Sequence, residues 1–90
     1  MNRKQRKELG LLPRQVLADM RKLAKTGVIN KDMTAKEIAL AVAMERASDD
    51  CCNETWQQVF EGVYEIDWDE VMRVLEMLIE LLIKYLPLFI

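Results

Sequence analysis

The chain has 90 residues, of which 51% are hydrophobic and 31% are charged, and its formal net charge is −2. This composition excludes an intrinsically disordered chain and is typical of one folded domain spanning residues 1–90. A chain this short buries only about 60–65% of the surface that it exposes when unfolded, so we expect a small stability margin.

The net charge hides a division of the chain into a basic and an acidic part. Residues 1–36 hold ten Lys or Arg and three acids, which gives +7, whereas residues 37–90 hold three bases and twelve acids, which gives −9. Such a basic arm indicates a contact with something anionic. Nucleic acid, a membrane surface and the acidic part of the same chain are the three alternatives.

The chemistry-bearing residue types argue against an enzyme. The chain has no histidine, and its two cysteines, Cys51 and Cys52, are adjacent. Adjacent cysteines form strained disulfides, so we expect reduced thiols and a cytoplasmic protein. Asp49–Glu54 is rich in metal-ligand types but lacks the spaced pairs of a zinc site and the central glycine of a calcium loop. We therefore predict no catalytic residues, no cofactor and no metal.

The first third of the chain predicts two helices. Asn2 is placed to cap a short basic helix that runs to Leu9, and Gly10 ends it. Pro13 suits the first turn of a second helix, whose buried face is marked by apolar residues at the i, i+4, i+7 spacing: Val16, Met20 and Leu23. Gly27 followed by Val28 is typical of a helix stop.

The middle third predicts two more helices. Thr34 with Glu37 forms a capping box, and the helix that follows, about 35–47, is rich in alanine, which lets a neighbouring helix approach closely. A polar turn at 48–50 leads to a fourth helix, capped by Asn53 or Asp50 and ended by Gly62. We expect its apolar side to carry Trp56, Val59 and Phe60, and the linker 63–66 to be extended.

The strongest pattern lies in the C-terminal segment. Asp67 caps a fifth helix, and Pro87 ends it near residue 85 or 86. At 100° per residue its charged side chains fall within a stripe about 80° wide, and the remaining surface is apolar. These charges are Asp69, Arg73, Glu76, Glu80 and Lys84. They recur every three or four residues, which argues against a membrane-spanning helix.

The basic arm makes nucleic-acid binding an alternative function. Arg14, Arg21 and Lys25 share one face of the second helix, and the side chains of Arg3, Lys4, Arg6 and Lys7 extend that patch. Contacts with phosphates would be sensitive to salt and nearly independent of sequence. The first aromatic residue is Trp56, so the arm has no aromatic side chain on which nucleic-acid bases could stack. The segment 27–34 is also too long for a helix-turn-helix turn.

We therefore predict an all-α fold, a small bundle of four to five helices with a long hydrophobic C-terminal helix. Residues 1–12 form a basic arm or short helix, 13–66 hold helices two to four, and 67–90 form the packing helix and an apolar tail. Helices two to four would have to cover about 280° of apolar surface, which is wider than the ~100° stripe of a typical surface helix. We therefore expect a non-catalytic interaction protein, a homo-oligomer or one that docks on a protein partner. Its small size suits an accessory protein of a phage or mobile element. The predicted interface is Leu78, Leu82, Leu86, Leu88, Phe89 and Ile90.

Overall fold

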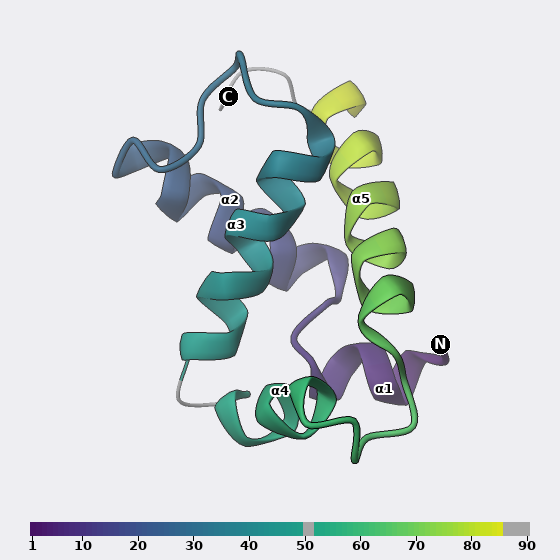
Figure 1. The fold of residues 1–90 in the computed structure, drawn as a ribbon. Helices are drawn as coiled ribbons and strands as arrows, with labels where there is room; N and C mark the ends of the chain where they lie inside the picture. The colour runs from purple at the N-terminus through teal and green to yellow at the C-terminus, as the bar shows by residue number, and fades with distance from the viewer. Residues whose placement is uncertain (50–51, 86–90) are drawn as a thin grey trace.

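The computed structural model describes residues 1–49 and 52–85 and contains five helices (Figure 1). They are α1 (Arg3–Glu8), α2 (Pro13–Lys25), α3 (Ala35–Ser48), α4 (Asn53–Phe60) and α5 (Trp68–Tyr85). No strand occurs among the described residues. The predicted all-α bundle is therefore confirmed.

Three helices begin where the sequence predicted a cap. The side chains of Asn2, Thr34 and Asp67 each accept a hydrogen bond from the backbone N–H three residues further on, at 2.9, 3.2 and 2.7 Å. Each bond satisfies a backbone donor that the first turn of a helix leaves without an internal partner. The starts of α1, α3 and α5 are thus specified locally.

The end of α2 also follows its sequence signal. Gly27 has a φ of +78°, a left-handed conformation that residues with a Cβ adopt at a cost. The N–H of Gly27 donates to the carbonyl of Ala24, and that of Val28 to the carbonyl of Leu23 at 2.9 Å. This pair of bonds is the Schellman motif, and it turns the chain toward Ile29, which is buried.

Two local predictions differ from the structure. Asn53 was predicted to cap α4 but is its first residue, and Cys52 occupies the cap position without a side-chain capping bond. The other predicted cap, Asp50, lies outside the described residues. The linker 63–66 bends where an extended path was predicted, and the N–H of Ile66 donates to the carbonyl of Tyr64 at 2.8 Å. The bend lets Ile66, only 4% exposed, reach the core.

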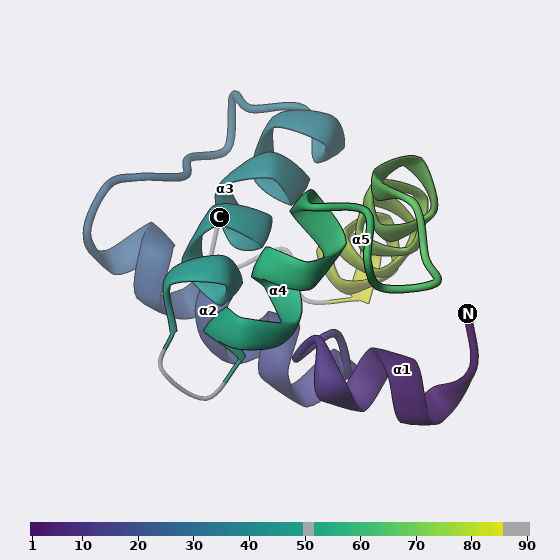
Figure 2. The same cartoon turned by 60° about the horizontal axis from the view of Figure 1, so that its bottom comes forward.

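The core lies where α2, α3 and α5 meet. Figures 1 and 2 show α3 and α5 side by side, with α2 packed across them and α4 and α1 at one end. Ala39 and Ala43 of α3 are completely buried, which agrees with the close helix approach predicted from its alanines. Larger side chains fill the centre, namely Val16, Met20, Ile38, Val42, Leu75 and Ile79.

The connection between α1 and α2 closes one end of this core. Leu9 and Leu11 are both fully buried, and Trp56 of α4 lies against them with its indole N–H donating to the Leu9 carbonyl at 2.8 Å. A buried indole N–H and a buried carbonyl each need a partner, and this bond supplies both. It ties segments that are 47 residues apart in the sequence.

Candidate interaction surfaces

An apolar stripe on α5 stays open to solvent. Met77 and Leu81 are 59% and 52% exposed, and Val74 and Leu78 beside them are half-buried. The four residues follow the i, i+3, i+4, i+7 spacing of one helical face, and we call them the α5 stripe. The buried residues of the helix, Val71, Leu75 and Ile79, lie on the side that packs against the core.

The structure places the predicted interface residues in two groups. Leu78 and Leu82 are half-buried and pack partly against the core, so neither presents a fully free side chain. Leu86, Leu88, Phe89 and Ile90 lie outside the described residues. The most exposed apolar side chains of α5, Met77 and Leu81, were not among the residues singled out from the sequence.

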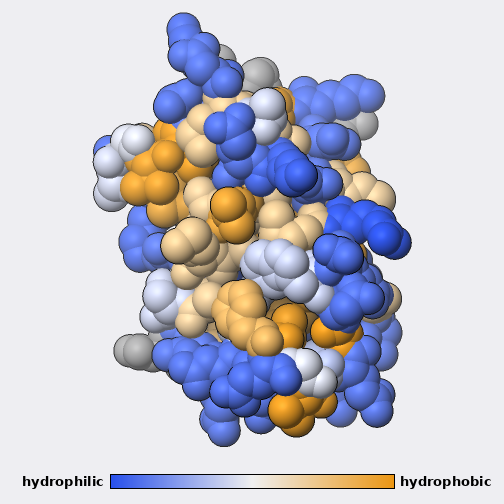
Figure 3. Space-filling model, in the orientation of Figure 1, coloured by the Kyte–Doolittle hydropathy of each residue, from blue (hydrophilic) through white to orange (hydrophobic). Residues whose placement is uncertain are grey.

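A second apolar area lies on α3. Leu40 and Met44, one turn apart, are 48% and 65% exposed. Figure 3 shows apolar colours gathered down the middle of the face on which α3 and α5 lie side by side, with hydrophilic side chains around them. Phe60 of α4 is also exposed, but its ring packs 5.1 Å from that of Trp68.

A basic groove lies between α1 and the beginning of α2. It is a cavity of about 560 Å³ lined by Arg3, Arg6, Leu12, Pro13 and Arg14. Arg3 and Arg14 are exposed, and Arg6 is half-buried with its Nε atom shielded from solvent and without a hydrogen bond among the described residues. We call this cavity the arginine groove.

The other basic residues of the arm are spread over several surfaces. Arg21 and Lys25 are exposed on α2, on the same face as Arg14. Lys7 is exposed on α1, and Lys4 borders a separate cavity that also contains the carboxylate of Glu8. The structure thus brings Arg3, Arg6 and Arg14 to one cavity, which the sequence alone did not distinguish from the rest.

The acidic part of the chain does not neutralise this arm. Within residues 1–49 and 52–85, Lys22 is the only basic side chain of the first 36 residues that forms an ion pair, and its partner is Glu45 of α3. Of the three alternatives for the anionic contact, the acidic part of the same chain therefore accounts for one lysine and for the N-terminal ammonium, which pairs with Glu70 at 2.6 Å. The arginines of the groove form no ion pair within the described part of the chain.

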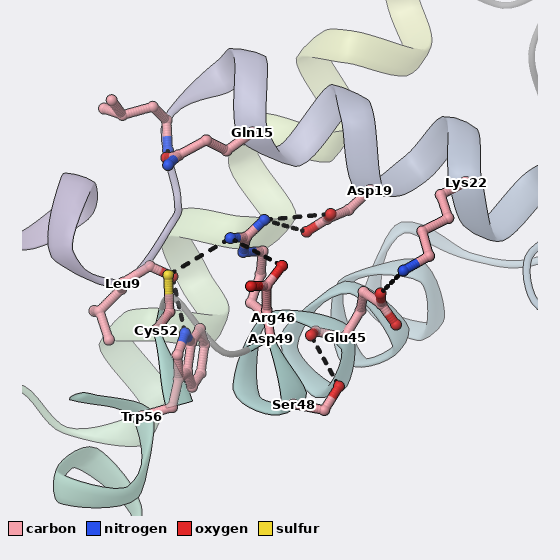
Figure 4. A network of polar contacts seen from close by, with 11 residues as sticks. Leu9, Gln15, Asp19, Lys22, Glu45, Arg46, Ser48, Asp49, Cys52 and Trp56 are labelled. Atoms are coloured by element: carbon pink, nitrogen blue, oxygen red, sulfur yellow. Dashed lines mark hydrogen bonds and ion pairs between the residues drawn. The ribbon is translucent and has the colours of Figure 1, made fainter. Parts of the chain in front are cut away.

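A buried polar network joins α2, α3 and α4 (Figure 4). The Arg46 guanidinium donates to both carboxylate oxygens of Asp19, at 3.1 and 3.3 Å, and also lies 3.7 Å from Asp49 and 3.5 Å from the Cys52 sulfur. Asp19 and Arg46 are each less than a tenth exposed. Burial raises the pKa of Asp19 because it disfavours the charged carboxylate, and the charge of Arg46 opposes this effect.

This network was missed in the sequence, although a signal for it exists. Asp19 falls between Val16 and Met20 on the buried face of α2, and Arg46 continues the spacing of Ala39 and Val42 on α3. A charged residue in register with a buried face indicates a buried partner. The network is enclosed and joins three helices, so we assign it a structural role.

Tyr64 lies in the turn before α5 and contacts α1, so the pKa of its phenol reports on that contact. Its hydroxyl donates to Glu8 at 2.6 Å, and burial together with this bond raises the pKa of Tyr64 to about 12. The folded state thus holds its proton more tightly than the unfolded state, whose tyrosine titrates near 10. We expect the free energy of unfolding to fall as the pH rises from about 10 to about 12.

An ultraviolet titration of the folded protein tests this expectation. The Tyr64→Phe variant should lose the phenolate absorbance that appears near pH 12. Glu8→Gln should lower that pKa because the carboxylate that holds the proton is gone, while burial keeps it above the ordinary value. A Tyr64 titration at the ordinary value in the wild type would contradict the contact.

Comparisons with known proteins do not add to this description. No family model, curated protein or solved structure matched the chain.

Two further findings concern membranes and metals. Among the described residues, no helix has the combined length and apolar character needed to cross a lipid bilayer. In the same part of the chain, no three Asp, Glu, Cys or His side chains are grouped so that they could hold a metal ion. Cys52 is buried against Arg46, and Cys51 lies outside the described residues.

Proposed function

We propose that this chain is a non-catalytic helical protein that self-associates, with a second copy of the chain packed on the α5 stripe. The observation that carries the proposal is the exposure of Met77 and Leu81 beside the half-buried Val74 and Leu78. Burying a large apolar side chain contributes about 1.5–3 kcal/mol before the costs of association are subtracted. A helical face of this spacing is suited to packing against another helix.

The charges that flank the stripe favour a second copy as the occupant. Antiparallel pairing of two α5 helices centred on Met77 brings Arg73 of one copy toward Glu80 of the other. A parallel pair would place each of these charged residues near the same residue of the other copy, which carries a charge of the same sign. The antiparallel arrangement also aligns the helix dipoles favourably. Such pairing is isologous, as in a dimer with twofold symmetry.

Light scattering over a series of protein concentrations tests the proposal. We expect the wild type to be a dimer at high micromolar concentration, and its mass to change little with salt because the contact is mainly apolar. The double variant Met77→Glu/Leu81→Glu should be a monomer, since dimerisation would bury four uncompensated carboxylates. Both side chains are more than half exposed, so the fold of one copy should survive the substitutions.

Leu40→Glu is the matched control. Leu40 is 48% exposed on α3, so the substitution adds a charge of the same sign at an apolar surface site outside α5, and the dimer should persist. Dissociation of the dimer by Leu40→Glu, with no effect of the α5 variant, would move the interface to α3. A wild type that is monomeric at every concentration would overturn self-association. If deletion of residues 86–90 then produced dimers, the occupant of the stripe would be the chain's own tail.

A further inference from the structure

The arginine groove has the features of a site for phosphate groups. Three guanidinium groups, from Arg3, Arg6 and Arg14, line one cavity of about 560 Å³, and its lining contains no acidic side chain. None of the three forms an ion pair with any acid in the described part of the chain. Like charges gathered without a counter-ion repel one another, and an anion between them relieves this repulsion.

The chemistry of the lining favours phosphate over other anions. Guanidinium groups present paired N–H donors that match two oxygens of one phosphate, and they remain charged at every physiological pH. The Nε–H of Arg6 is shielded from solvent and lacks a hydrogen-bond acceptor among the described residues. A buried donor without an acceptor is costly, so a ligand oxygen that reaches Arg6 gains from that bond.

The neighbouring surface indicates a polyanion longer than one phosphate. Arg21 and Lys25 follow Arg14 by seven and eleven residues, which places all three on one exposed face of α2. At 1.5 Å per residue, the line from Arg14 to Lys25 is about 16 Å long. This length spans several phosphates of a nucleic acid, whose duplex carries a charge about every 1.7 Å along its axis.

We infer that the chain binds the phosphate backbone of a nucleic acid, with one phosphate in the arginine groove and others along Arg21 and Lys25. The residues of this surface are basic or aliphatic, and the first aromatic residue of the sequence is Trp56. The lining of the arginine groove therefore offers no ring on which a base could stack, and the binding is independent of base sequence. This function is separate from the self-association proposed above.

Fluorescence anisotropy with a labelled DNA duplex of arbitrary sequence, and with a labelled single-stranded RNA, tests the inference. The wild type should bind at least one of the two at low salt, with the logarithm of the binding constant falling linearly with the logarithm of salt concentration. The triple variant Arg3→Gln/Arg6→Gln/Arg14→Gln should bind more weakly. Because the groove holds one phosphate, the slope of its salt dependence on duplex should be smaller by roughly 1.

The control variant removes positive charges that do not line the arginine groove. Lys31→Gln/Lys36→Gln changes two exposed lysines near the start of α3, and it should bind as the wild type does apart from a small uniform weakening. Arg14→Lys keeps the charge but loses the paired donors, so its affinity should lie between those of the wild type and the triple variant. Circular dichroism of each variant checks that it is folded.

The outcomes separate the possible ligands. Failure of the wild type to bind DNA or RNA at low salt overturns the inference. Equal losses in the triple variant and the lysine control would also overturn it, because the groove would not be the site. If vesicles with anionic headgroups bind but nucleic acids do not, the phosphates recognised are those of lipids. Nucleic-acid binding by Met77→Glu/Leu81→Glu would show that the groove functions without the α5 contact.

Discussion

Replacing Trp56 with alanine is expected to lower the free energy of unfolding by about 3–5 kcal/mol. Trp56 is completely inaccessible to solvent, and it lies between Leu9 and the ring of Trp68, whose centroid is 6.0 Å away. The substitution leaves a cavity at the end of the core and leaves the Leu9 carbonyl without its donor. Domains of this kind have a total stability of about 5–15 kcal/mol, so the variant should be largely unfolded on mild denaturation.

Urea denaturation followed by circular dichroism measures this effect, with two controls. Trp56→Phe keeps a ring in the core but removes the indole donor, and should cost about 1–3 kcal/mol. Phe60→Ala removes a ring that is 57% exposed and should cost less than Trp56→Ala. Equal losses for Phe60→Ala and Trp56→Ala would contradict the burial of Trp56.

Replacing Asp19 with alanine should destabilise the fold by about 3–5 kcal/mol. The variant takes from the buried Arg46 guanidinium the carboxylate that accepts two of its hydrogen bonds, and the Asp49 carboxylate, 3.7 Å away, is more distant. Asp19→Asn retains the shape and a hydrogen-bond acceptor, so its loss should be smaller than that of Asp19→Ala.

A double variant separates the ion pair from the space that it fills. Asp19→Leu/Arg46→Met replaces both charges with apolar side chains of similar size, and its stability should approach that of the wild type. Thermal and urea melts of Asp19→Leu, Arg46→Met and the double variant complete the double-mutant cycle. Additive losses in the double variant would indicate that Asp19 and Arg46 do not interact in the folded protein.

The helix starts and stops were predictable because each depends on residues close in sequence. Asn2, Thr34 and Asp67 satisfy backbone donors three residues away, and Gly27 ends α2 through bonds to its own last turn. The buried face of α2 followed from its apolar spacing in the same way. The cap of α4 was missed because Asn53 was a favourable capping residue with no feature to show that the helix begins one position earlier.

The candidate surfaces were less predictable because they depend on which helices meet. The 80° polar stripe of α5 left most of the helix apolar, and nothing local showed that the packing with α3 covers Leu75 and Ile79 but not Met77 and Leu81. The grouping of Arg3, Arg6 and Arg14 likewise depends on the path between α1 and α2. In both cases the sequence supplied the residue types, and the tertiary contacts supplied their arrangement.

The turn between α1 and α2 imposes two separate conditions on position 10. Gly10 has a φ of +73°, and a Cβ built on it would lie 2.5 Å from Nε of Arg46. A side chain there would be strained by the backbone and would also displace the buried guanidinium from its carboxylate. A substitution of Gly10 therefore requires a compensating substitution at position 46. In a homologous chain with alanine at position 10, we expect a shorter residue at 46 and an uncharged one at 19.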